Sequence, residues 1–180
     1  METTLKKIAY AFQRARIHWG IGGSYLLKKH GIASSANDVD IVIAPESMDK
    51  ALEILDFWGE RRETKTDPNY ETARYISYDI EGTHVDVMSD IKVRFNEELY
   101  HYEFDSESVW YQDRKDGVKY PYMRLEDWYV LYYFMKREQR LEALDMYIES
   151  AQRFDLSRID MLTSKSQYKN ELMLRLNQSV

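Results

Sequence analysis

The sequence Ile21-Gly22-Gly23-Ser24, followed after residues 25–37 by Asp38-Val39-Asp40-Ile41-Val42-Ile43, decides the fold of this chain. Because side chains alternate between faces along a strand, Asp38 and Asp40 direct their carboxylates to the same face. The simplest interpretation is a pair of solvated aspartates at the start of a buried strand. Aspartate is disfavoured in strands, however, so two of them in one strand favour a functional role.

These residue types suit a particular chemistry. Two ionised carboxylates held side by side repel each other unless a cation lies between them. Mg²⁺ prefers oxygen ligands and commonly takes one or two carboxylates together with substrate phosphates. A glycine pair at a helix start allows close backbone approach, and free N–H groups there attract phosphate. The stretch therefore predicts a phosphate site at Gly22, Gly23 and Ser24 beside a metal site at Asp38 and Asp40.

A third carboxylate occurs on a later apolar run, Thr83-His84-Val85-Asp86-Val87-Met88. Val85 and Val87 face one side of this predicted strand, whereas His84 and Asp86 face the other. Asp86 is either an exposed aspartate on a half-buried strand or the third member of the metal site. In a two-metal site such a carboxylate can accept a proton from an attacking hydroxyl. His84 could orient Asp86, although a structural histidine is the commoner case.

Composition limits the class of protein. The chain has 180 residues, no cysteine and a formal net charge of -6. This length predicts one domain, or a core with a helical appendage. The absence of cysteine excludes disulfides and zinc–thiolate sites. Since no strong basic excess is present, we expect no extended DNA binding. No apolar run approaches the roughly 20 residues that span a bilayer, and no signal peptide is evident, so we expect a cytoplasmic protein without membrane contact.

Apolar spacing predicts the elements of the first half. The expected elements are, in order, a helix over 2–15, a strand over 17–21, a helix capped by Ser24 and stopped at Gly31, a strand over 38–44, a helix from Pro45 to about Trp58, an edge strand within 60–66, a turn at Asp67-Pro68-Asn69, and a hairpin of 73–80 and 83–88.

The second half has weaker signals. Residues 90–108 are expected to be irregular, with a short helix near residues 96–99, and residues 109–120 to form a hairpin. From Leu125 the spacing becomes helical and predicts three helices, the third running from about Leu156 into the tail. The expected division is a core over 1–122 and a helical extension over 123–180, packed together as one compact unit.

The order of these motifs resembles the DNA polymerase beta-like nucleotidyltransferase superfamily. That superfamily has an apolar-Gly-Gly/Ser signature, a short gap, an Asp-x-Asp/Glu pair and a third acidic residue on a later strand. Here the matching residues are Ile21-Gly22-Gly23-Ser24, Asp38-Val39-Asp40 and Asp86. The helical tail resembles the extension of small bacterial and archaeal members. The resemblance covers about residues 17–88 and implies an α+β fold, a mixed β-sheet with helices on one face, plus C-terminal helices.

The resemblance also implies an activity. Asp38, Asp40 and Asp86 would be catalytic and would hold two Mg²⁺ ions, and Gly22, Gly23 and Ser24 would bind the phosphates of ATP or another NTP. The enzyme would transfer a nucleoside monophosphate from the NTP to a hydroxyl of a small-molecule, protein or tRNA acceptor. Lys136, Arg137 and Arg140 could form a phosphate-binding wall, although a solvated helix face explains them more simply.

A second hypothesis belongs to a different class. The chain could be a nucleotide-binding or regulatory module of a toxin–antitoxin or defence pair with little catalytic turnover. The intact set of Asp38, Asp40 and Asp86 argues against this alternative, because a degenerate member often loses one of them. Apolar residues near the end of the tail, such as Leu172 and Leu176, would then serve a partner or a homodimer.

Overall fold

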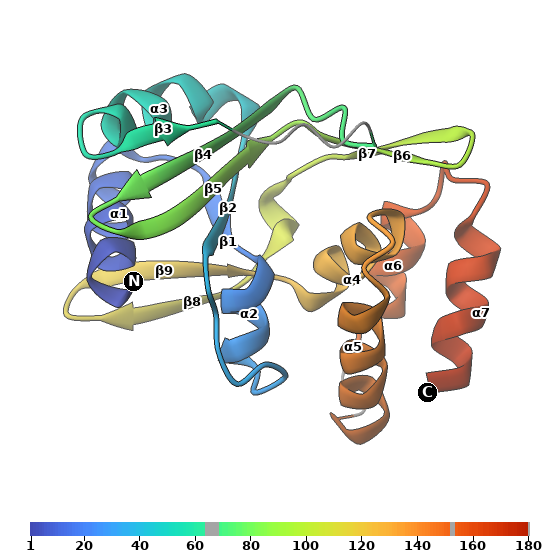
Figure 1. Ribbon diagram of the computed structural model, residues 1–180. Helices are drawn as coiled ribbons and strands as arrows, with labels where there is room; N and C mark the ends of the chain where they lie inside the picture. Colours follow the sequence, from blue (N-terminus) through green and yellow to red (C-terminus); the bar gives the residue numbers. More distant parts are fainter. Residues whose placement is uncertain (64–68, 152–153, 180) are drawn as a thin grey trace.

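The computed structural model describes residues 1–63, 69–151 and 154–179, which form two sheets and two groups of helices (Figure 1). The strands are β1 (Trp19–Ile21), β2 (Val39–Ile43), β3 (Glu60–Arg62), β4 (Arg74–Ile80), β5 (Thr83–Ser89), β6 (Ile91–Phe95), β7 (Glu98–Tyr102), β8 (Val109–Lys115) and β9 (Val118–Met123). The α-helices are α1 (Glu2–Ala15), α2 (Gly23–Lys29), α3 (Met48–Asp56), α4 (Leu125–Phe134), α5 (Glu138–Ala151), α6 (Leu156–Leu162) and α7 (Lys169–Ser179). Two short 3₁₀ helices are η1 (Pro45–Ser47) and η2 (Ser106–Ser108).

The larger sheet is mixed, as expected. Its strand order is β3-β4-β5-β2-β1-β9-β8, so the two motif strands β1 and β2 lie at its centre. β2 runs parallel to β5, and β1 runs parallel to β9, whereas the other neighbours are antiparallel. Central strands are the most rigid part of a sheet because both edges are hydrogen-bonded. Asp40 and Asp86 therefore stand on interior strands, which are hydrogen-bonded along both edges.

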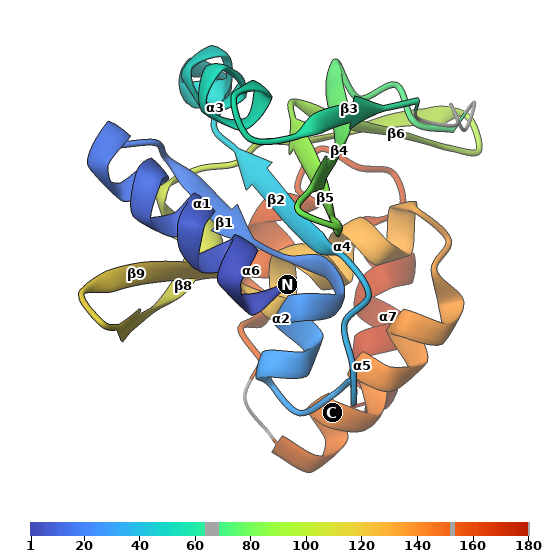
Figure 2. The same ribbon diagram turned by 60° about the vertical axis from the view of Figure 1, so that its left-hand side comes forward.

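One face of this sheet is covered by α1 and α3 (Figures 1 and 2). The apolar stripe of α1 is buried, and its Phe12 meets Trp19 of β1 edge to face with 5.3 Å between ring centroids. Trp19 pairs with Ile43, and Ile21 pairs with Ile41, so these four side chains share that face. Asp40, next to Ile41, therefore points to the opposite face.

The helices α4 to α7 gather away from α1 and α3 (Figures 1 and 2). Helical spacing of apolar residues predicts the helix that begins at Leu125, and all ten residues of α4 are buried. This happens because α4 is the central helix, which packs against α5, α6, α2 and β6. A helix that is enclosed on all sides has no solvated face, so its sequence need not alternate apolar and polar residues with a 3.6-residue period.

Two predictions in the second half are wrong. Residues 90–108 contain the β6–β7 hairpin, not an irregular segment with a helix near residues 96–99. Ile91, Val93 and Phe95 are buried while Lys92 and Arg94 lie outside, which is the period-two pattern of a strand. The tail forms two helices, α6 and α7, in place of one that starts at Leu156.

The first half agrees closely with its prediction. The helix over 2–15 and the hairpin of β4 and β5 are confirmed, and β2 begins at Val39, so Asp38 immediately precedes it. The proposed capping role of Ser24 is wrong: the N-cap of α2 is Gly22, and Ser24 lies inside the helix. Asp67 and Pro68 of the predicted turn lie outside the described residues. None of the described helices is long and apolar enough to cross a bilayer.

Candidate active site

Asp40 and Asp86 lie side by side on neighbouring parallel strands. The register of β2 and β5 pairs Asp40 directly with Asp86. Residues paired in this way point to the same face, and neighbouring strands are only about 4.8 Å apart. Asp86 is largely buried, and Asp40 is partly buried. The fold therefore forces two carboxylates together on the face opposite α1, as the alternation in each strand predicted.

Asp38 joins this pair from the residue before β2. Its Oδ1 accepts a hydrogen bond of 2.8 Å from the Oγ of Ser24, which is itself buried. The bond ties the start of β2 to the first turn of α2. Ser24 thus holds one of the three predicted metal ligands in place, a role that its position in the glycine motif did not reveal.

The two glycines of the motif are required by packing. A Cβ on Gly22 would overlap the indole of Trp128 on α4, and a Cβ on Gly23 would overlap the carboxylate of Asp40. Gly23 also has a φ of +55°, which glycine adopts without strain. The Gly22 N–H donates to the carbonyl of Asp40 at 3.0 Å. Gly22 therefore serves the sheet and α4, and Gly23 allows α2 to start against Asp40.

The electrostatics of Asp40 follow from this crowding. Burial raises the pKa of Asp40, and the negative charges of Asp38 and Asp86 raise it further, to about 8. A hydrogen bond from the Ser24 backbone and the more distant charge of Arg140 act in the opposite direction. The site therefore concentrates negative charge beyond what its own cations balance, which is the condition under which a bound cation is favoured.

Asp86 is held by a network on the strands around it. Its Oδ1 accepts hydrogen bonds from Ser77, the residue opposite it on β4, and from Nε2 of His84 at 2.8 Å. His84 Nδ1 lies 3.5 Å from the guanidinium of Arg62, which favours the tautomer with hydrogen on Nε2. The suggested contact of His84 with Asp86 is confirmed. The sequence analysis did not predict the contact of Ser77 with Asp86, although counting residues across the β4–β5 hairpin pairs Ser77 with Asp86.

The C-terminal helices bring further groups to this face. Tyr132 of α4 is largely buried, and the nearby charges of Asp40 and Asp38 help to raise its pKa after the larger effect of burial. Arg140 of α5 lowers the pKa of both Asp40 and Tyr132. The structure thus places Arg140 within electrostatic reach of the carboxylates. From the sequence, a solvated helix face is the simpler explanation for Arg140, and a phosphate-binding wall is the alternative.

The carboxylates suit a hard divalent cation. Within the described ranges, no group of three or more His, Cys, Asp or Glu side chains lies close enough together to hold a metal ion, so Asp38, Asp40 and Asp86 do not form a three-carboxylate cluster in this structure. Mg²⁺ seldom uses such a cluster, since it is usually held by one or two carboxylates, water and substrate phosphates. Asp40 and Asp86, paired across β2 and β5, meet that requirement and provide only oxygen ligands.

Comparison with solved structures identifies this architecture. A candidate nucleotidyltransferase from Thermotoga maritima superposes with a TM-score of 0.63 at 20% identity, covering 82% of this chain and 92% of that chain. The chain has the nucleotidyltransferase fold. The antibiotic-resistance factor ANT(2'')-Ia shares it in its solution structure, with a TM-score of 0.56, 15% identity and coverage of 99% of this chain and 98% of that chain. A crystal structure of ANT(2'')-Ia holds adenylyl-2''-tobramycin and matches with a TM-score of 0.50 at 14% identity, covering 98% and 95%.

Comparison of the sequence alone finds no relatives. No family model matches it, and no curated protein does. Overall sequence similarity therefore does not reveal the fold. The short motifs do, through the residues Gly22, Gly23, Asp38, Asp40 and Asp86. For fold class the structural comparison confirms the expectation of a mixed sheet with C-terminal helices.

Proposed function

We propose that this chain is a Mg²⁺-dependent nucleotidyltransferase that moves a nucleoside monophosphate from an NTP to a hydroxyl of an acceptor. The observation that carries the proposal is the pairing of Asp40 with Asp86 on adjacent parallel strands, with Asp38 beside them. The shared fold of nucleotidyltransferases supports it. Small-molecule, protein and tRNA acceptors all fit the proposal. The adenylylated tobramycin in ANT(2'')-Ia favours a small molecule.

In the proposed reaction the acceptor oxygen attacks the α-phosphorus, a new P–O bond forms, and the bond to the leaving pyrophosphate breaks. Asp38 and Asp40 would hold Mg²⁺ against the phosphates, and Asp86 would complete the site. Bound Mg²⁺ would neutralise the charge on the attacking and leaving oxygens. Asp86, whose Oδ1 accepts hydrogen bonds from Ser77 and His84, would receive the acceptor proton. Gly23 and Ser24 would lie beside the phosphates, and Arg140 would face them.

The proposal is tested by calorimetric titration of ATP and GTP into the full chain, with Mg²⁺ or with EDTA. We expect binding of at least one nucleotide with Mg²⁺, and a loss of tenfold or more in affinity with EDTA or in Asp38→Asn/Asp40→Asn. The pair Asp113→Asn/Asp116→Asn removes the same charge from the exposed β8–β9 hairpin and should bind as the wild type does. Absent binding, or binding indifferent to metal and to the site variant, would favour the regulatory module.

His84 provides a second test, as a positioning residue. His84→Ala should lower kcat by about tenfold and change the KM for NTP less than twofold, because Asp86 loses the donor that fixes its orientation. His84→Gln should recover part of kcat, since its amide N–H can donate to Asp86. The matched control is His101→Ala, because His101 also bonds an aspartate, Asp90, but away from this face. Equal activity of His84→Ala and wild type would exclude the role.

A further inference from the structure

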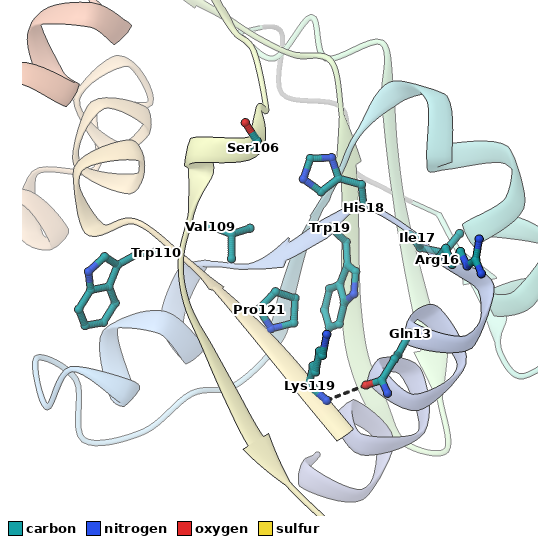
Figure 3. Close-up of a pocket in the computed structure, with 10 residues that line it drawn as sticks. All are labelled: Gln13, Arg16, Ile17, His18, Trp19, Ser106, Val109, Trp110, Lys119 and Pro121. Atoms are coloured by element: carbon teal, nitrogen blue, oxygen red, sulfur yellow. Dashed lines mark hydrogen bonds between the residues drawn. The ribbon is translucent and has the colours of Figure 1, made fainter. Parts of the chain in front are cut away.

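A pocket of about 500 Å³ lies away from the acidic residues, between the end of α1, β1 and the β8–β9 hairpin (Figure 3). Trp19 forms part of its wall, and Trp19 shares the α1 face of the sheet with Ile43. Asp40 points to the opposite face. None of Asp38, Asp40 and Asp86 is among the residues that line the pocket. Its volume falls within the range of roughly 300–1,000 Å³ that is usual for small-molecule sites.

The pocket is lined by two cationic side chains, and Gln13, His18 and Ser106 supply its other polar groups. Arg16 at the end of α1 and Lys119 on β9 both line it, and both are exposed. No Asp or Glu is among the lining residues, although the chain has 31 acidic and 25 basic residues. Other cations near these elements are paired, such as Lys6 with Asp116 and Lys29 with Asp113. In the part of the chain that the structure describes, the side chains of Arg16 and Lys119 have no such partner.

The inner wall of the pocket is apolar and fixed. Trp19, Ile17 and Pro121 line it and are buried, so their positions are set by the core. Gln13 joins the two sides: its Oε1 accepts from the Lys119 N–H at 2.9 Å, and its Nε2 donates to the Gly117 carbonyl at 3.3 Å (Figure 3). Because α1 is tied to the hairpin in this way, the pocket is formed before any ligand arrives. Such preorganisation reduces the cost of binding.

We propose that this pocket binds a small organic anion with a flat apolar body. The anionic group lies at the rim of the pocket, where Arg16 and Lys119 supply positive charge and lack a partner within the described chain. The flat body lies against the indole of Trp19 and the ring of Pro121. The lining favours an anion over a neutral or cationic compound, because its charged side chains, Arg16 and Lys119, are both positive and would repel a cation. The site does not depend on the acidic residues or on the proposed nucleotidyl transfer.

The test is calorimetric titration of the full chain with 2-naphthoate, which has a flat ring system and one carboxylate. We expect a Kd below about 1 mM, and at least about tenfold weaker binding of neutral 2-naphthamide and of inorganic phosphate. Arg16→Gln/Lys119→Gln should weaken 2-naphthoate by about tenfold or more. These are surface positions, so the fold should persist, and circular dichroism checks this.

The matched control is Arg14→Gln/Arg114→Gln, which removes the same charge from exposed positions that do not line the pocket. It should leave the affinity for 2-naphthoate within twofold of wild type. Four outcomes would overturn the proposal: no binding of 2-naphthoate at 10 mM, equal binding of the amide, equal binding of phosphate, or an equal loss in the control pair. Because no metal or nucleotide is present, failure here leaves the proposed transferase activity untouched.

Discussion

Replacement of Asp40 by asparagine is expected to reduce Mg²⁺-dependent nucleotidyl transfer by at least about 10³-fold. Asp40 is the central member of the acidic set, because it pairs with Asp86 on β5 and follows Asp38 by two residues. Asparagine keeps the shape of the side chain but removes the charge that would hold the cation. The measurement is pyrophosphate release from ATP and GTP with a panel of hydroxyl acceptors, comparing the variant with wild type. Transfer that survives in Asp40→Asn would refute the metal assignment.

The same substitution is expected to stabilise the metal-free protein. Burial and the charges of Asp38 and Asp86 raise the pKa of Asp40 to about 8, so the folded chain keeps a proton there that the unfolded chain loses near pH 4. The folded state binds more protons between these values, and stability therefore falls as pH rises from 4 to 8. Asparagine does not ionise, so Asp40→Asn should not show this fall in stability with pH. We expect a gain of roughly 2 kcal/mol at pH 8 in EDTA, or about 4–8 °C in Tm.

A control with the opposite sign separates this effect from a general charge effect. Asp56 pairs with Arg61, whose hydrogen bond lowers the pKa of Asp56. Asp56→Asn should therefore lower the Tm at pH 7, whereas Asp40→Asn raises it. Thermal unfolding from pH 5 to pH 8 in EDTA would show a steeper decline for wild type than for Asp40→Asn. Parallel curves for the two proteins would contradict the buried, charge-crowded environment of Asp40.

The motif strands could be predicted because local sequence determines them. A β-branched run that contains Asp38 and Asp40 has few alternatives, and glycines at 22 and 23 permit a sharp strand-to-helix junction. The reasons for those glycines are tertiary, however: Gly22 accommodates Trp128, more than a hundred residues away, and Gly23 accommodates Asp40. No local pattern contains these contacts. The sequence therefore indicates that Gly22 and Gly23 matter, but it does not reveal which side chains they pack against.

The second half was harder for physical reasons. The β6–β7 hairpin has the alternation Ile91-Lys92-Val93-Arg94-Phe95, but it turns at Asn96-Glu97 without a glycine. Asn96 takes the positive φ of 52° that glycine usually provides. The break between α6 and α7 likewise has no proline or glycine, and hydroxyl groups at Thr163 and Ser164 bond back to helix carbonyls. Where polar side chains end a helix or a strand, the positions of glycine and proline do not predict its boundary.

The largest expected loss of stability comes from a buried ion pair in the C-terminal half. Asp127 of α4 is fully buried, and the Arg158 side chain of α6 is 4% exposed. Arg158 donates from Nε to Asp127 Oδ1 at 2.8 Å and from Nη2 to Oδ2 at 2.6 Å. Tyr102 of β7 also donates to Oδ2 at 2.6 Å, and Arg158 reaches Asp105 at 3.0 Å. One network thus joins α4, α6, β7 and the residue before η2.

Asp127→Asn should lower the free energy of unfolding by about 3–5 kcal/mol, because the buried Arg158 loses its buried carboxylate and keeps an ion pair only with the more exposed Asp105. A loss of that size corresponds to a fall in Tm of about 10 °C or more. Asp116→Asn, which breaks the exposed pair with Lys6, should cost under about 1 kcal/mol. Removing both buried partners in Asp127→Leu/Arg158→Met should cost less than Asp127→Asn alone, since no buried charge is left uncompensated. A double variant that is less stable than either single variant would show that the charges themselves, beyond their mutual compensation, hold α6 onto α4.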